Sequence, residues 1–264
     1  MVDYPSINKH QHLKQPAKYF LTKKHLMQPI KNASGETLDV DLHDAEKSDC
    51  LVIFGHGVTG NKDRPMLIEL ADALAENGWP CLRMSFSGNG NSEGKFTESN
   101  ITKEISDLGA VIDQLGTGKR IAYIGHSMGG AVGTLFAARD ERIKVLVSLA
   151  GMVRTAAFTD REFGDVTPDE GNMWDEPDCP LSKVFVHDLH QIGDTLDAAR
   201  ELRVPWLLLH GTADDVVLPE DSRDLNKVLR GPSKLVEIDG AGHSFEGHYS
   251  RLAEEISEWL EKHL

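Results

Sequence analysis

Cysteines, aromatic residues and long apolar runs are all scarce in this sequence of 264 residues. Its three cysteines, Cys50, Cys81 and Cys179, form no C-x-x-C pair and are too few for a disulfide framework, so free thiols are expected. No apolar stretch approaches the roughly 18 residues of a membrane span, and Met1 to Pro16 has no apolar segment of signal-peptide length. We therefore expect a cytoplasmic protein that does not bind membranes.

Basic residues are also few: 28 Lys and Arg against 42 Asp and Glu leave a net charge of −14. This balance argues against general binding to nucleic acid or to anionic membranes, because both need a basic surface. The hydrophobic fraction of 40% and the charged fraction of 27% are typical of a globular protein. We expect a small-molecule partner, and a monomer or a homodimer.

Short apolar runs alternate along the chain with segments of helical spacing. The predicted strands lie near 25–31 and at 36–43, 50–54, 79–86, 120–124, 143–149, 204–210 and 234–238. The predicted helices lie at 65–77, 101–115, 128–139, 219–229 and 249–263. This alternation predicts an α/β fold with a mostly parallel, eight-stranded sheet and helices on both faces.

The alternation lapses between Gly151 and about Arg200. Residues 159–178 of this stretch contain eight acidic residues and a single basic residue, Arg161. We expect a cap or lid at 151–200, inserted into a core made of 17–150 and 201–264, with a loose N-terminal arm at 1–16. The acidic side chains of the cap are expected to face solvent.

The segment Gly125-His126-Ser127-Met128-Gly129 fits the G-x-S-x-G pattern of a nucleophile elbow. It directly follows a predicted strand and opens a predicted helix, which is the context that this motif requires. The glycines let strand and helix approach closely around a strained serine, and the helix N-terminus favours developing negative charge. Ser127 is therefore the predicted nucleophile.

A serine nucleophile needs a base, and the base needs an acid that orients it. In this kind of fold the acid and then the histidine follow the serine, each after the end of a strand. Asp214 and Asp215 follow the strand predicted at 204–210, and His243 follows the strand predicted at 234–238. His243 is the predicted base, but residue types alone do not separate the two aspartates.

A tetrahedral intermediate also needs hydrogen-bond donors for its oxyanion. The residue after the nucleophile supplies one backbone N–H, which here is Met128. The second donor is expected in the loop after the strand at 50–54, which reads His56-Gly57-Val58-Thr59-Gly60-Asn61.

From about residue 25 to its end, the chain resembles the α/β-hydrolase superfamily. The acid loop of that superfamily, HG-x-x-D-x-x-V, is similar to His210–Val217 and implies that Asp214 is the acid. The loop His56–Asn61 resembles the HG-x-T-G-N oxyanion loop of small esterases, which implies that Val58 is the second donor. A further loop, Ser85–Ser92, resembles D-x-x-G-x-G-x-S, with Ser85 in place of the usual aspartate.

Together with the GHSMGG elbow and the insertion, these loops look most like those of the cinnamoyl and feruloyl esterase group. The resemblance implies a serine hydrolase that cleaves carboxylic esters through an acyl-enzyme, with no metal and no organic cofactor. A thioesterase or an aminopeptidase would use the same triad, and a non-catalytic receptor on the same scaffold remains a third reading. A dehalogenase is disfavoured, because its elbow carries an aspartate at the position of Ser127.

Specificity is expected to come from the insertion, because the triad and the oxyanion donors are generic. Its aromatic residues either fill the core of the cap or face the substrate, and the candidates for substrate binding are Phe158, Phe163, Trp174 and Phe185.

The other histidines are expected to have structural or surface positions rather than catalytic or metal-binding roles. The side chain of His126 should point away from Ser127, and His210 should bond loop backbone. His187 and His190 should lie at the surface, since no metal motif surrounds them.

Overall fold

A computed structural model describes residues 28–264, so the arm predicted at 1–16 lies outside the described residues. The strands in this range are β1 (Ile30–Lys31), β2 (Thr37–Leu38), β3 (Val40–His43), β4 (Cys50–Gly55), β5 (Cys81–Met84), β6 (Arg120–His126), β7 (Ile143–Leu149), β8 (Trp206–Gly211) and β9 (Ser233–Ile238). The helices are α1 (Pro65–Glu76), α2 (Ile101–Leu115), α3 (Met128–Ala137), α4 (Thr155–Phe163), α5 (Lys183–Ile192), α6 (Leu196–Glu201), α7 (Pro219–Val228) and α8 (Tyr249–His263), with 3-10 turns η1 (Phe96–Glu98) and η2 (Met173–Asp175).

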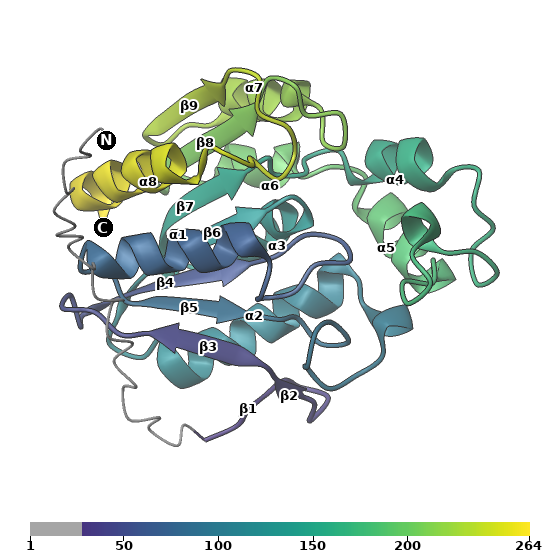
Figure 1. Cartoon of the computed structure of the whole chain (residues 1–264), viewed down its shortest axis with the longest axis horizontal. Helices are drawn as coiled ribbons and strands as arrows, with labels where there is room; N and C mark the ends of the chain where they lie inside the picture. Colours follow the sequence, from purple (N-terminus) through teal and green to yellow (C-terminus); the bar gives the residue numbers. More distant parts are fainter. Residues whose placement is uncertain (1–27) are drawn as a thin grey trace, which may run out of the picture.

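A mostly parallel sheet forms the centre of the molecule (Figure 1). Seven strands follow one another in the order β3-β5-β4-β6-β7-β8-β9. Only the edge strand β3 runs antiparallel to its neighbour, and all other neighbours in this sheet are parallel. The carboxyl ends of β4, β6, β8 and β9 therefore meet at one edge of the sheet, where ligands bind in folds of this class.

The prediction of eight strands in the sheet is wrong by one. β1 pairs with β2 in a separate two-stranded ribbon, because the side chain of Asn32 accepts the Ser34 and Glu36 N–H groups and turns the chain back. The strand predicted at 36–43 is also interrupted at Asp39, whose N–H donates to the Ser92 hydroxyl at 2.8 Å.

This interruption changes the burial of the apolar side chains around it. Leu38 is buried in the ribbon, but Leu42, which was expected on the same buried face, is 43% exposed on the edge strand β3.

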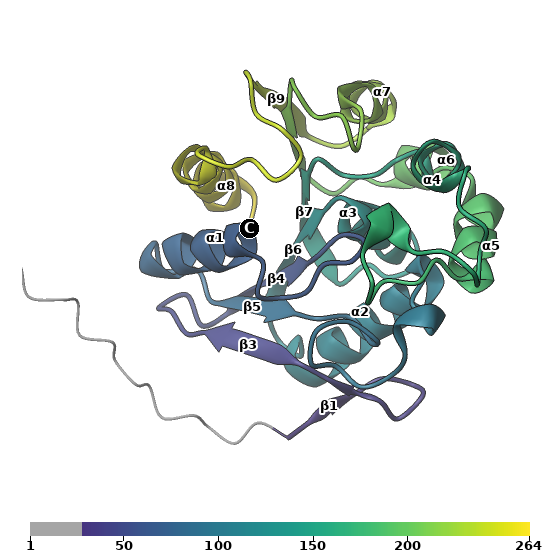
Figure 2. The ribbon, with the colours of Figure 1, turned by 45° about the vertical axis from the view of Figure 1, so that its right-hand side comes forward.

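Helices cover both faces of the sheet (Figure 2). α1 packs against α8 on one face, and α2 packs against α3 on the other. Side chains of the same strand alternate between the two sides: Val52 and Phe54 of β4 join the core under α1 and α8, whereas Leu51 and Ile53 join the opposite core. Because both faces are buried, the central strands are apolar throughout, as the sequence predicted.

The stretch 151–200 contains α4, η2, α5 and most of α6 but no strand. Figure 1 shows α4 and α5 beyond the ends of the central strands. The start of this stretch is tied to α7 by Asp221, which accepts the Val153 and Arg154 N–H groups, and by an ion pair between Arg154 and Asp224. The lapse in alternation thus corresponds to a helical segment, and its status as a separate cap stays a prediction.

Residues 28–264 show the state of the cysteines and the length of the apolar helices. All three cysteines are free, as expected, and Cys50 and Cys81 are fully buried. None of the helices in this range is long and apolar enough to cross a membrane.

Candidate active site

Ser127 lies at the sharp turn between β6 and α3 and has strained backbone angles, with φ at 54° and ψ at −121°. The turn is tight enough that a Cβ atom on Gly125 would lie 2.3 Å from the Gly129 carbonyl oxygen, so only glycine fits there. The Ser127 carbonyl accepts the N–H groups of Gly130 and Met152, both at 2.9 Å. These contacts over-determine the turn and hold the strained serine in place.

Asp214 and His243 are brought together from two neighbouring strand ends. Asp214 follows β8, His243 follows β9, and the Asp214 Oδ2 atom lies 2.9 Å from His243 Nδ1. Asp214 is buried, whereas Asp215 is exposed. The structure thus gives the two aspartates, which residue types alone could not separate, very different environments.

A second histidine supports the Asp214 carboxylate from the buried side. His210 is fully buried; its Nδ1 lies 2.7 Å from Ser222 Oγ, and its Nε2 lies 2.8 Å from the Val217 carbonyl and 3.3 Å from Asp214 Oδ2. The backbone contact is the one expected for His210, and the contact with Asp214 is additional.

These hydrogen bonds decide the charge of Asp214. Burial opposes ionisation of its carboxyl group, but hydrogen bonds from His210 and His243 outweigh burial and hold the pKa of Asp214 below its usual range. Asp214 is therefore a carboxylate at neutral pH and accepts the Nδ1 proton of His243.

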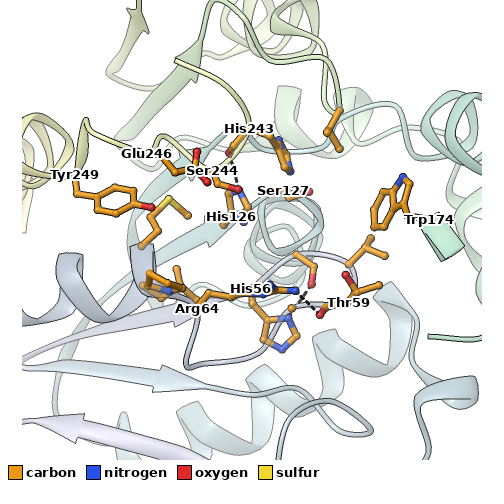
Figure 3. A pocket seen from close by; sticks show the side chains of 17 residues that line it. His56, Thr59, Arg64, His126, Ser127, Trp174, His243, Ser244, Glu246 and Tyr249 are labelled. Atoms are coloured by element: carbon orange, nitrogen blue, oxygen red, sulfur yellow. Dashed lines mark hydrogen bonds between the residues drawn. The ribbon is translucent and has the colours of Figure 1, made fainter. Parts of the chain in front are cut away.

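Ser127 and His243 line the same cavity, and Figure 3 shows both side chains on its wall. Among residues 28–264, the Ser127 hydroxyl has no hydrogen-bond partner. His126 packs against His243 with ring centroids 4.7 Å apart, and its Nε2 lies 3.0 Å from the His243 carbonyl oxygen. The side chain of His126 thus contacts the loop of the predicted base rather than Ser127.

The loop after β4 closely approaches the nucleophile. A Cβ atom on Gly57 would lie 2.6 Å from Ser127 Cβ, so any side chain at this position would displace the serine. The next residue, Val58, and Met128 both have backbone N–H groups that donate to no other group in residues 28–264. Both amides therefore remain available as hydrogen-bond donors.

His56 holds this loop in place. It is buried, its Nε2 accepts the Phe86 N–H at 3.0 Å, and its Nδ1 lies 2.9 Å from the Gly57 carbonyl. These partners require a proton on Nδ1, and burial lowers the pKa of His56 to about 4, so the ring is neutral near pH 7.

Ser85 replaces the aspartate of the similar loop and still makes hydrogen bonds. Its hydroxyl accepts the Lys62 N–H at 3.1 Å, and its carbonyl accepts the Ser92 hydroxyl at 2.7 Å. A serine at this position therefore still links the loop after β5 to the loop after β4.

The cavity has a volume of about 650 Å³ and is lined by residues on both sides of Ser127. Trp174 lies on one side of Ser127, and Arg64 and Tyr249 lie on the other (Figure 3). Its walls come from the loop after β4, the start of α1, the elbow and the loop before α8; the lining residues are His56, Gly57, Val58, Thr59, Gly60, Arg64, Pro65, Met66, Leu67, His126, Ser127, Trp174, Val216, His243, Ser244, Glu246 and Tyr249.

Of the four aromatic residues considered for substrate binding, only Trp174 lines this cavity. Phe158, Phe163 and Phe185 are each at most 3% exposed and do not line it, because their rings pack edge to face with centroids about 6 Å apart. Trp174 is 40% exposed, rests on Phe163 and donates its indole N–H to Glu162 at 3.0 Å. Glu162, which was expected simply to face solvent, thus orients the tryptophan.

Sequence reasoning missed several cavity residues, among them Arg64, Glu246 and Tyr249. Two signals were available: Arg64 lies six positions after Val58 in the same loop, and Tyr249 is the first residue of the helix that follows His243. Neither signal gives the direction of a side chain, which here depends on how α1 and α8 pack together.

One of the two histidines considered for a metal site has another partner. His190 Nε2 lies 2.8 Å from Asp160 Oδ1 at the surface. Residues 28–264 contain no group of three or more His, Cys, Asp or Glu side chains placed to hold a metal ion.

Comparisons with known proteins agree with this architecture. Residues 51–178 match a family model described as the alpha/beta hydrolase fold. The structure of Est1E from Butyrivibrio proteoclasticus with ferulic acid bound superposes with a TM-score of 0.80 at 27% identity, over 89% of this chain and 98% of that chain.

A second group of similar proteins includes a thioesterase. The mitochondrial palmitoyl-protein thioesterase ABHD10 of Bos taurus is 26% identical over 182 residues, which are 63% of this chain and 57% of that protein. The structure of alpha/beta hydrolase domain-containing protein 10 from mouse superposes with a TM-score of 0.75 at 17% identity, over 89% of this chain and 98% of that chain.

The parallel sheet, the strained serine after β6 and the carboxylate–imidazole pair after β8 and β9 agree with these matches. The matches and the fold support a general hydrolase activity. The chain has the α/β-hydrolase fold.

Proposed function

We propose that the protein is a serine hydrolase that cleaves carboxylic esters of small molecules through an acyl-enzyme intermediate. One observation carries the proposal: a buried carboxylate lies 2.9 Å from an imidazole that shares a cavity with a strained, otherwise unbonded serine hydroxyl. This combination is what nucleophilic catalysis by serine requires.

In the proposed mechanism Ser127 attacks the ester carbonyl while His243 takes its proton. The Asp214 carboxylate keeps the Nδ1 proton in place and stabilises the imidazolium that forms. The backbone N–H groups of Val58 and Met128 bind the oxyanion, and their lack of other partners supports this role.

His243 then protonates the leaving group, and the alcohol departs. Water attacks the acyl-enzyme with His243 again acting as the base, and the acid is released. Apart from the substrate and water, every group used in these steps is a residue of the chain.

Ester cleavage is favoured as the first reading because the similar structure of Est1E carries ferulic acid, a carboxylic acid of the kind that such a reaction releases. Thioester cleavage is the second candidate, because the bovine and human relatives are palmitoyl-protein thioesterases. Both reactions would use Ser127, Asp214 and His243 in the same roles.

A fluorophosphonate probe tests the shared part of the proposal. We expect the wild-type protein to be labelled at one site, and the Ser127→Ala variant to remain unlabelled. Absence of labelling in the folded wild type would contradict the serine mechanism and favour a non-catalytic role for this scaffold.

A pair of substrates with the same acyl group separates the two candidates. We expect a higher kcat/KM for a phenyl ester than for the thiophenyl ester of the same acid. The opposite ranking would favour the thioesterase reading.

A further inference from the structure

Two neighbouring side chains of α4, Arg161 and Glu162, connect the tryptophan of the cavity wall with the loop that carries the predicted acid. Glu162 accepts the Trp174 indole N–H on Oε2 at 3.0 Å and the Arg161 Nε–H on Oε1 at 2.9 Å. Another N–H of the Arg161 guanidinium donates to the Val216 carbonyl oxygen. Trp174 and Val216 both line the main cavity. The Arg161–Glu162 pair thus joins two parts of the cavity wall without lining the cavity itself.

The peptide group between Val216 and Val217 links Arg161 to Asp214. Its carbonyl oxygen accepts the hydrogen bond from Arg161, and its N–H, on Val217, donates to Asp214 Oδ1 at 3.0 Å. A peptide group is planar, so a contact that fixes its carbonyl oxygen also fixes the direction of its N–H. A hydrogen bond from a charged guanidinium also polarises the group and strengthens its N–H as a donor. Arg161 therefore acts on the Asp214 carboxylate through a single peptide group.

The contact between Arg161 and Glu162 is not explained by the helix that carries both residues. Consecutive residues of an α-helix do not face each other. The side chain of Arg161 is 36% exposed, and an ion pair on so exposed a side chain adds little to stability. The two side chains meet because each also reaches a partner outside α4, Val216 for Arg161 and Trp174 for Glu162.

Trp174 has a backbone conformation that depends on such contacts. Its φ of 48° and ψ of 33° lie in the left-handed region, which bulky residues rarely adopt. A strained conformation of this kind persists only where surrounding contacts over-determine it. The hydrogen bond to Glu162 is one of these contacts, and the Phe163 ring, with its centroid 4.9 Å from that of the indole, is another.

We propose that Arg161 and Glu162 are positioning residues, which fix the Trp174 wall of the cavity and the loop of Asp214 relative to each other. The inference rests on the proposed function, because the orientation of Asp214 matters only if a triad performs the chemistry. Arg161 orients the acid through the peptide group after Val216, and Glu162 places the tryptophan. Because one ion pair joins the two, a disturbance of either residue affects both the acid and the wall.

The variant Arg161→Met tests the acid end of this link, because it keeps an unbranched side chain and loses every donor. We expect kcat to fall about tenfold on methyl ferulate and on methyl butyrate alike, since a misplaced catalytic group costs rate on every substrate. KM should change less than kcat. The matched control is Arg200→Met, which removes an arginine paired with Asp197 on α6 and should leave kcat unchanged.

The variant Glu162→Gln tests the tryptophan end. An amide offers one acceptor oxygen where the carboxylate offers two, so either Arg161 or Trp174 loses its acceptor. The ratio of kcat/KM between methyl ferulate and methyl butyrate should change about fivefold. Glu170→Gln makes the same charge change at an exposed position of the same segment and should leave the ratio unchanged.

Acrylamide quenching of tryptophan fluorescence gives a second measurement on Glu162→Gln. Trp174 is 40% exposed, whereas the other three tryptophans are at most 8% exposed, so quenching is dominated by Trp174. We expect stronger quenching in Glu162→Gln than in the wild type, because the indole is released. Equal quenching together with an unchanged substrate ratio would remove Glu162 as a positioning residue.

The double variant Arg161→Met/Glu162→Gln tests whether the two residues act as one unit. Residues of one hydrogen-bond network have non-additive effects, whereas independent residues have additive ones. We expect kcat of the double variant to be about that of Arg161→Met alone. Losses that multiply in the folded double variant, or an unchanged kcat in Arg161→Met, would overturn the inference; circular dichroism checks the fold of each variant.

The rate of fluorophosphonate labelling separates failure of this inference from failure of the proposed function. We expect Arg161→Met to be labelled about tenfold more slowly than the wild type, because the activation of Ser127 depends on its base and on the acid that orients it. A wild type and an Arg161→Met variant labelled at the same rate would remove only this inference. An unlabelled wild type would remove both proposals.

Discussion

Asp214 holds His243 with one carboxylate oxygen and its own loop with the other. Oδ2 lies 2.9 Å from His243 Nδ1, and Oδ1 accepts the backbone N–H groups of Val216 and Val217, both at 3.0 Å. With both oxygens engaged, the carboxylate cannot rotate without breaking these three hydrogen bonds and its contact with His210. The orientation of the imidazole is therefore fixed by the backbone of the loop after β8.

The first prediction separates the two neighbouring aspartates. Asp214→Asn should lower kcat by roughly 10⁴, because an amide N–H facing Nδ1 favours the wrong tautomer of His243. Asp215→Asn, at an exposed position, should change kcat little. Steady-state kinetics on one ester measures both variants, and the reverse ranking would move the acid to Asp215.

The second prediction concerns the stability conferred by Asp214. The pKa of Asp214 in the folded state lies below its unfolded value of about 3.9. The Asp214 carboxylate therefore stabilises the fold fully above that value, and this contribution is lost as the pH falls through the folded pKa. The free energy of unfolding of the wild type should fall relative to that of Asp214→Asn as the pH is lowered from about 5 to about 3. This holds whatever the difference between the two proteins at pH 7.

Urea unfolding of both proteins at several pH values measures this difference. Asp215→Asn serves as the control and should follow the wild type across the range. Parallel curves for the wild type and Asp214→Asn would contradict the depressed pKa.

The third prediction concerns the nucleophile. Ser127→Ala should reduce kcat by about 10⁴ to 10⁶, because no acyl-enzyme can form, while the fold survives the loss of one oxygen atom. Circular dichroism and thermal unfolding check the fold, and kcat checks the chemistry. A variant that keeps more than about a tenth of the wild-type activity would rule out the serine mechanism.

The fourth prediction concerns pH dependence. We expect kcat/KM to rise with pH, because a histidine base accepts a proton only when it is neutral. Two nearby histidines do not account for this rise. Burial lowers the pKa of His56 to about 4, and burial together with repulsion from His243 lowers the pKa of His126 to about 3.

A pH–rate profile on a neutral ester, whose own charge does not change, measures this ionisation. A flat profile from about pH 5 to 8 would argue against His243 as the base.

The fifth prediction contrasts Trp174 with the phenylalanines beneath it. Trp174→Ala should change the ratio of kcat/KM between methyl ferulate and a short alkyl ester by about tenfold, or 1.4 kcal/mol, with little loss of stability. Phe163→Ala should instead lower the free energy of unfolding by about 3 kcal/mol or more, because it opens a hole among packed rings.

Kinetics on both substrates and thermal unfolding of both variants test this contrast. Equal effects of Trp174→Ala on the two esters would remove this tryptophan as a specificity element.

The sequence predicted the alternating elements of the sheet well, because parallel strands buried on both faces are continuously apolar. It also predicted the strand ends from which Ser127, Asp214 and His243 come, since each follows such a run directly. It did not predict the break at Asp39, because the hydrogen bond to Ser92 comes from a residue 53 positions away. The separate ribbon β1–β2 depends on this break.

The sequence by itself determined the order of strands and helices and the residues of the elbow. Its composition also excluded strongly basic and disulfide-stabilised classes of protein. These features follow from local periodicity, turn chemistry and composition. Only the tertiary structure decided that Trp174 lines the cavity while Phe163 fills a core, and that Asp214 rather than Asp215 is buried beside His243. Such assignments depend on which distant side chains pack together, and one sequence read along its length carries no record of those contacts.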